Sequence, residues 1–200
     1  LIAAPAWPTA ALAPLAWLGD AIAIKDPTAA AFRRQSGANL IMIGQQSEAA
    51  LAMIMVSLVS LASQQPVAGQ EVPGGAKFYL LDGSPPDAMH VGTLARMAHV
   101  LPHAVEVGGP RDVPRIIGEL AAELERRQTT NEADPPALYL VVYDLPRFRE
   151  LRKAEDDFGF SRGDDKPNPA KQFPTLLREG PGFGIHVIAW CDTLNNLYRS

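Results

Sequence analysis

A glycine between an apolar run and a helical pattern is the feature of this sequence best suited to chemistry. The apolar run Leu40 to Ile43 stops at Gly44, a polar turn follows, and a helical pattern extends from about Glu48 to Ser63. A turn of this kind presents backbone N–H groups at a helix N-terminus, where they can bind phosphate. The sequence therefore predicts the framework of a phosphate-binding loop.

The side chains that such a loop needs are missing. The nucleotide-binding pattern G-x-x-x-x-G-K-[ST] uses its lysine to neutralise phosphates and its hydroxyl to hold Mg²⁺. Gly44 fits the first position, but Ala49, Ala50 and Leu51 stand at the second glycine, the lysine and the hydroxyl. Glu48 would face phosphate oxygens. We expect no hydrolysis here, while weak backbone-mediated nucleotide binding stays open. The candidate loop comprises Gly44, Gln45, Gln46, Ser47, Glu48, Ala49, Ala50 and Leu51.

Two aspartates follow apolar strand patterns near the end of the chain. Asp144 comes directly after the run 137–143, and Asp192 follows the run 185–190 and Cys191. Ligands of parallel sheets bind beyond the carboxyl ends of the strands, so Gly44, Asp144 and Asp192 are predicted to open on one edge. Each aspartate has two interpretations. It is a remnant of a Mg²⁺ or nucleotide site, or it caps the next turn.

A basic run and the histidines are the remaining candidates. The run includes Arg147 and Arg149. It forms a solvated helix face, or it contacts DNA, a neighbouring subunit or, as an arginine finger, a neighbour's phosphates. Pro102 separates His99 from His103, and no cluster of cysteines or carboxylates completes a ligand set, so we predict no metal site. His186 lies in an apolar strand pattern and is predicted to be a core or edge histidine.

Composition bounds the class of protein. The 200 residues are 47% hydrophobic and 20% charged, which is enough for one domain with a sizeable core. A protein that binds DNA across a broad face is usually basic, and the net charge of −4 argues against this class. Cys191 is the only cysteine, which excludes an internal disulfide and favours a reducing, cytoplasmic compartment. Residues 1–18 form a proline-broken lead-in unlike a signal peptide or a membrane-spanning helix. The missing Met suggests a piece of a longer protein.

Apolar strand patterns alternate with helical ones, which predicts an α/β fold with a mostly parallel sheet covered on both faces. In the helix over 113–127, Asp112 is predicted to be the cap and Arg127 to lie on the exposed side. A charged insert is expected over 145–170. Strands are predicted at 40–43, 77–82, 104–107, 137–143 and 185–190, with a weaker one at 19–24 and a polar approach at 28–34. Helices are predicted at 48–63, 87–100, 113–127 and 173–179.

The order of these features resembles the motor domain of the FtsK/SpoIIIE family of DNA-translocating P-loop ATPases. The resemblance extends from about Trp17 to Asn195, within a domain placed at 19–200, and no single motif is intact. It is closest in character to the degenerate domains of multi-domain members such as the ATPases of type VII secretion. The segments that carry it are Leu18-Gly-Asp20, Asn39 to Gly44, Leu120 to Arg127, Leu138 to Asp144 and Gly184 to Ala189.

The resemblance implies a P-loop NTPase-like (RecA-like) fold and an ATP/Mg²⁺ site. It places the Walker B aspartate at Asp144, the adjoining catalytic glutamate position at Leu145 and a polar sensor near Asp192. It also implies partners: other ATPase domains or subunits, with DNA or a secreted protein as cargo. We therefore expect a pseudo-ATPase domain with a structural or regulatory role. A divergent ATP-driven DNA translocase and a peptide-recognition module are the alternatives. No membrane insertion is expected in this segment, and an anchor elsewhere in the parent protein is left open.

Overall fold

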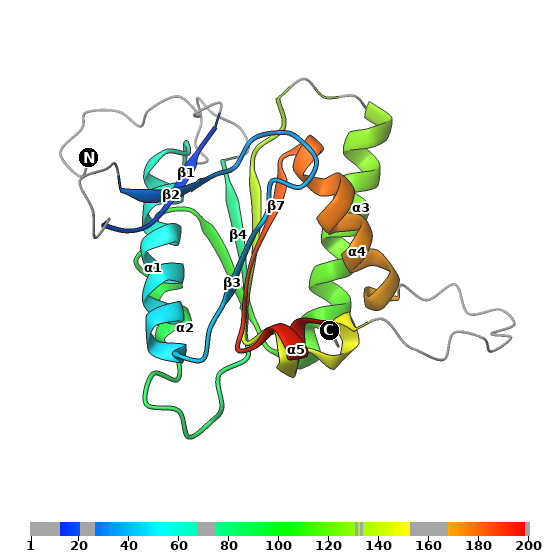
Figure 1. Cartoon of the computed structure of the whole chain (residues 1–200). Coiled ribbons are helices and arrows are strands. Elements are labelled where there is room, and N and C mark those ends of the chain that lie inside the picture. The colour runs from blue at the N-terminus through cyan, green and yellow to red at the C-terminus, as the bar shows by residue number, and fades with distance from the viewer. Residues whose placement is uncertain are drawn as a thin grey trace, which may run out of the picture.

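A five-stranded, all-parallel sheet forms the centre of the molecule (Figure 1). The computed structural model describes residues 13–20, 27–67, 75–130, 132, 134–152 and 168–198. The strand order across the sheet is β3-β7-β6-β4-β5, so the last strand lies between the first and the fourth of this sheet. The strands are β3 (Leu40–Ile43), β4 (Lys77–Asp82), β5 (Ala104–Gly108), β6 (Leu138–Tyr143) and β7 (Ile185–Cys191).

Helices cover both faces of this sheet and make a three-layer α/β/α domain (Figure 1). One face carries α1 (Ser47–Ser63) and α2 (Thr93–Ala98), and the other carries α3 (Val113–Thr130) and α4 (Pro169–Glu179). The short helix α5 (Leu194–Tyr198) contacts β7. The prediction of an α/β fold with a parallel sheet is confirmed, because every strand pairing in this sheet is parallel.

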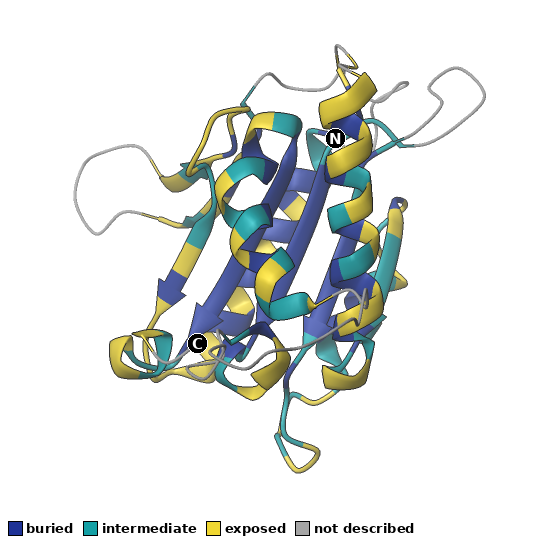
Figure 2. Cartoon of the chain, turned by 90° about the vertical axis from the view of Figure 1, so that its right-hand side faces the viewer, coloured by how far each residue is buried: buried dark blue, intermediate teal, exposed yellow. Residues whose placement is uncertain are grey.

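Burial on both faces explains why the central strands lack polar alternation. Every residue of β6 and β7 is buried (Figure 2). Successive side chains point to opposite faces, so both must be apolar when helices cover both. Toward α1 and α2 the core includes Phe78, Tyr139 and Ile188, and toward α3 and α4 it includes Leu140 and Val187.

Helix α1 is buried on two sides because a separate two-stranded sheet covers its flank. The antiparallel strands β1 (Leu15–Gly19) and β2 (Thr28–Ala31) form this sheet, and β1 runs along α1. Polar side chains of α1 satisfy the backbone of β1. The Gln64 amide both accepts from the Leu15 N–H and donates to the Leu15 carbonyl, and Ser60 Oγ accepts from the Trp17 N–H. The helix thus takes the place of a neighbouring strand.

The structure differs from the sequence-based element boundaries in several places. Strand β1 begins inside the segment expected to be a lead-in, and β2 replaces the polar approach. Most of the weak strand at 19–24 and residues 153–167 of the charged insert lie outside the described residues. Helix α2 is shorter than predicted because turns occupy residues 86–92, whereas α4 begins at Pro169, before its predicted start. Helix α5 was not predicted.

Two predicted roles in the helix at 113–127 are wrong. The carboxylate of Asp112 accepts a hydrogen bond from the Gly109 N–H, so it closes the preceding turn rather than capping α3. Arg127 is buried, at 2% exposure, and its guanidinium donates to Glu123 and to the carbonyls of Phe183 and Pro136. These bonds supply the partners that a buried charge requires. None of the helices in the described part of the chain is both long and apolar enough to span a membrane.

His186 is a core histidine, as predicted, and it gives the fold a pH dependence. Its Nδ1 lies 2.8 Å from the Ala38 carbonyl, and its ring stacks on Tyr139. Burial lowers the pKa of His186 to about 4, opposed by the bond to Ala38 and assisted by Arg34 and Arg127. The unfolded chain therefore binds a proton at a higher pH than the native one. Stability from this residue is complete above about pH 6.5 and is lost as the pH falls toward 4.

We predict that the free energy of unfolding falls by on the order of 3 kcal/mol between pH 7 and pH 4 because of His186. Urea unfolding across this range measures the effect, and His186→Gln should flatten the pH dependence while lowering the stability at pH 7. Burial also lowers the pKa of His103, so part of the slope remains in the variant. An unchanged slope in His186→Gln would contradict the assignment.

Candidate functional site

The connection between β3 and α1 is short. Residues 44–46 alone join the two elements, and α1 begins at Ser47, one residue before its predicted start. Gln46 precedes the helix in an extended conformation and provides no side-chain cap. The first N–H groups of α1 are therefore not capped by this side chain. Of the eight residues of the candidate loop, the five from Ser47 to Leu51 belong to the helix.

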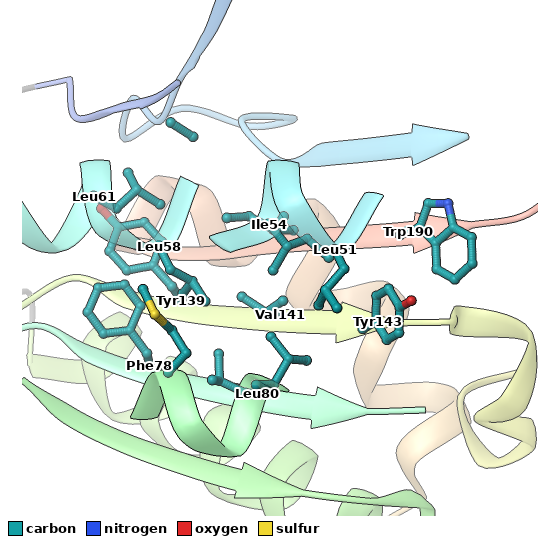
Figure 3. Close-up of a cluster of buried hydrophobic side chains, with 14 of the residues drawn as sticks. Leu51, Ile54, Leu58, Leu61, Phe78, Leu80, Tyr139, Val141, Tyr143 and Trp190 are labelled. Atoms are coloured by element: carbon teal, nitrogen blue, oxygen red, sulfur yellow. The ribbon is translucent and has the colours of Figure 1, made fainter. Parts of the chain in front are cut away.

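Ala50 and Leu51 are buried in the core, at 2% and 5% exposure. Both belong to the hydrophobic cluster between α1 and the sheet, where Leu51 packs near Tyr143 (Figure 3). These are the positions at which a working nucleotide loop carries its lysine and its hydroxyl. Side chains at both positions therefore face the sheet, and the loop lacks the groups that bind phosphate and Mg²⁺.

Two stacked aromatic side chains donate hydrogen bonds to backbone carbonyls of the loop. The Trp190 indole N–H donates to the Gly44 carbonyl at 2.9 Å, and the Tyr143 hydroxyl donates to the Ser47 carbonyl at 3.2 Å. Their ring centroids are 4.9 Å apart and nearly parallel, and Figure 3 shows both at the carboxyl ends of β6 and β7. We call Tyr143 and Trp190 the aromatic brace. Sequence reasoning missed it, although both are the last residues of predicted strands.

Carboxylates dominate the electrostatics of this edge. Burial raises the pKa of Tyr143, and its hydrogen bond to Ser47 opposes this shift. The carboxylates of Asp144, Asp82 and Glu48 raise the pKa further. Glu48 is largely exposed, and its carboxylate lies 3.3 Å from Nε2 of His90. A nucleotide phosphate brought to this edge would meet negative charge, and like charges raise the free energy of binding.

Asp144 lies in a strained turn at the end of β6. Its φ of 65° makes it the one non-glycine residue with a positive φ in the described part of the chain. A Cβ on Gly83 would lie 2.6 Å from the Tyr143 carbonyl, so a glycine is needed beside this turn. Burial raises the pKa of the Asp144 carboxyl, Arg147 opposes this, and Asp192 adds to it. Its carboxylate makes no cap bond to the following 3₁₀ turn, Leu145–Arg147.

Asp192 organises the turn into α5. Both of its carboxylate oxygens accept hydrogen bonds from the Asn196 side chain, at 2.8 and 2.9 Å. The Asn196 amide is also the main cause of a lowered pKa at Asp192. This geometry favours the turn-capping interpretation of Asp192. Leu145, which holds the position of the catalytic glutamate in the resemblance, is buried.

Arg147 and Arg149 are exposed on two consecutive 3₁₀ turns rather than on one helix face. The neighbouring Arg152 donates to the Pro146 carbonyl. Arg147 acts electrostatically on the Asp144 of its own chain. Both side chains are exposed, so they lie where a partner could contact them.

Two shallow hollows flank the loop. One, of about 480 Å³, is lined by residues 45–49 and is polar, with Gln45, Gln46 and Glu48 on its walls. The other, of about 240 Å³, lies between α1 and β3 and has apolar walls that include Met42, Met53 and Trp190. We call the second one the apolar hollow. The sequence-predicted residues Gly44, Gln45, Gln46 and Ala49 border it.

No family model matches the chain, and no curated protein matches its sequence.

We predict that Tyr143→Phe loosens the start of α1, because it removes the hydroxyl that donates to the Ser47 carbonyl. The loss should lower the free energy of unfolding by about 1 kcal/mol. Hydrogen exchange should accelerate at the amides of residues 44–51. Tyr139→Phe is the matched control, since it removes a hydroxyl that bonds to Gln65 far from the loop. Equal exchange at these amides in both variants would contradict the role of the brace.

We predict that Ala50→Lys destabilises the domain and restores no nucleotide binding. Its side chain would enter the core between α1 and the sheet, where burying an unpaired ammonium costs several kcal/mol. Thermal unfolding and titration with ATP measure the two effects. Ala52→Lys, at an exposed position of the same helix, is the control and should unfold near the wild-type temperature. Nucleotide binding gained by Ala50→Lys would show that this position faces the loop.

Proposed function

We propose that this chain is a pseudo-ATPase domain of the FtsK/SpoIIIE type, with a structural or regulatory role in a larger ATPase assembly. It keeps the parallel α/β framework and the strand–glycine–helix entry, and it binds partner proteins rather than turning over nucleotide. The parallel sheet with helices on both faces is consistent with a P-loop-type fold. The partners in this proposal are other ATPase domains or subunits of the same assembly.

One observation carries the proposal: α1 begins at Ser47 and buries Ala50 and Leu51 against the sheet. A working loop needs a lysine and a hydroxyl in these positions, facing the phosphates. Here both positions face the core, so a side chain at either one would point away from the phosphates. The aromatic brace fixes the loop in this arrangement. The carboxylates of Glu48 and Asp144 add repulsion where a phosphate would bind.

The peptide-recognition alternative is favoured by a separate observation. The apolar hollow beside the loop is lined by Met42, Met53 and Trp190, and flexible methionines suit adaptable protein contacts. In a doubly wound sheet, ligands bind where neighbouring strands continue to opposite faces. One such point lies between β3, which leads to α1, and β7, which leads to α5 on the other face.

We predict that calorimetric titration with a non-hydrolysable ATP analogue and Mg²⁺ gives no saturable binding up to about 1 mM nucleotide, a free energy weaker than about −4 kcal/mol. Asp144→Ala should give the same result, because its carboxylate has no nucleotide-bound Mg²⁺ to hold. Micromolar binding, or Mg²⁺-dependent turnover that Asp144→Ala abolishes, would overturn the proposal and favour a divergent motor domain.

A further inference from the structure

The outer edge of β3 pairs with no other strand in the described part of the chain. Strand β3 is an edge strand of the sheet, and it pairs with β7 on one side. In a parallel ladder, alternate residues bond to the neighbouring strand. The Gly44 N–H donates to the Cys191 carbonyl at 3.1 Å, so Gly44, Met42 and Leu40 face β7. The N–H and C=O groups of Ile41 and Ile43 therefore point outward, and no described residue pairs with them.

The side chains of the same two residues are exposed as well. Ile41 and Ile43 are 43% and 42% exposed. They lie on the same face of the sheet as α3 and α4, but these helices cover strands farther from this edge. Exposed sheet edges are usually protected by charges, prolines or bulges. The sequence Leu40-Ile-Met-Ile43 contains none of these. This edge therefore offers two free donor–acceptor pairs and two apolar side chains in register.

The apolar hollow lies beside this edge on the other face of the sheet. Met42 points to that face, and Met53 of α1 forms the opposite wall. In a strand placed against β3, alternate side chains would point to opposite faces. One set would cover Ile41 and Ile43, and the other set would enter the hollow between Met42 and Met53. Strand addition would fill both surfaces at once.

We propose that the outer edge of β3 binds an extended peptide segment of a partner protein by strand addition. The segment carries apolar, β-branched side chains on both of its faces and a Lys or Arg at the end beside Gly44. Charge complementarity assigns that basic residue, since the largely exposed carboxylate of Glu48 lines the neighbouring polar hollow at this end of the strand and the chain carries a net charge of −4. This proposal does not depend on whether the loop binds nucleotide.

A second copy of this chain fits the edge less well than a peptide. Pairing of β3 with its own symmetry mate would place the partner's α1 beside the flank of α1 that carries Met53, Ser57, Ser60 and Gln64, at helical spacing. Strand β1 already covers the last three of these residues, through bonds to Ser57, Ser60 and Gln64. A single strand needs no such space.

The test uses a pool of synthetic peptides of about eight residues, a usual strand length, with Val, Ile, Leu or Thr in the centre and Lys at both ends. Peptides retained by the wild-type chain are titrated individually by fluorescence anisotropy. We expect Ile41→Lys to weaken binding by at least about tenfold, because it places a charge beside the added strand. Val59→Lys, which changes a residue of similar exposure on the outer side of α1, should leave the affinity within about twofold.

Backbone pairing has a readout that side-chain contact alone would not give. On peptide binding, the amides of Ile41 and Ile43 should gain protection from hydrogen exchange, while that of Met42, already bonded to β7, should not change. Methylation of a single peptide nitrogen should abolish binding only at alternate positions of the peptide, those whose N–H groups point toward β3. The proposal is overturned if no peptide distinguishes wild type from Ile41→Lys at about 100 µM, or if sedimentation shows that the chain dimerises through Ile41 instead.

Discussion

The packing of α1 against the sheet is the contact on which the other features depend. Leu51, Ile54, Leu58 and Leu61 meet the strands along one stripe of the helix (Figure 3). Once this stripe is buried, the rotation of the helix is fixed. Ala50 then faces inward, Met53 borders the hollow, and Ser57, Ser60 and Gln64 face β1. Apolar burial of the helix, rather than the loop sequence itself, thus determines which side chains of the candidate phosphate loop could reach a ligand.

The electrostatics of the strand ends reinforce this outcome. An anion site needs donors or cations where the phosphate lies, and here the carbonyls of Gly44 and Ser47 are held by the aromatic brace while Glu48 and Asp144 supply negative charge. Arg147 is the nearby cation that acts on Asp144. A surface of this kind suits a partner with its own positive charge.

Apolar runs and helical patterns predicted most of the fold from the sequence, because burial sets both. The five sheet strands and α1, α3 and α4 follow such patterns. Strands β1 and β2 escaped prediction because Leu15–Gly19 is stabilised by side chains of a helix about 40 residues away, which no local pattern reveals. The exposure predicted for Arg127 was wrong for a related reason. Its partners, the carbonyls of Phe183 and Pro136, come together only in the folded chain.

The candidate site was predictable in position but not in content. Strand ends followed by Gly44, Asp144 and Asp192 do meet at one edge, as parallel pairing requires. The brace and the hollow depend on which side chains of β6, β7 and α1 share a face, and this follows only from the strand order. Trp190 is the last residue of the strand predicted at 185–190, and nothing in the sequence shows that its indole N–H reaches the Gly44 carbonyl.

The pairing of β3 with β7 has a consequence for how the chain folds. The Val187 N–H donates to the Asn39 side chain across a separation of 148 residues, so β3 joins the sheet only after nearly the whole domain has been closed into a loop. Contacts of such separation are entropically expensive and tend to slow folding. On the ribosome, β3 and α1 emerge long before their neighbour β7. Until β7 arrives, both edges of β3 are unpaired, which makes this short apolar strand a site where a nascent chain can associate wrongly or meet a chaperone.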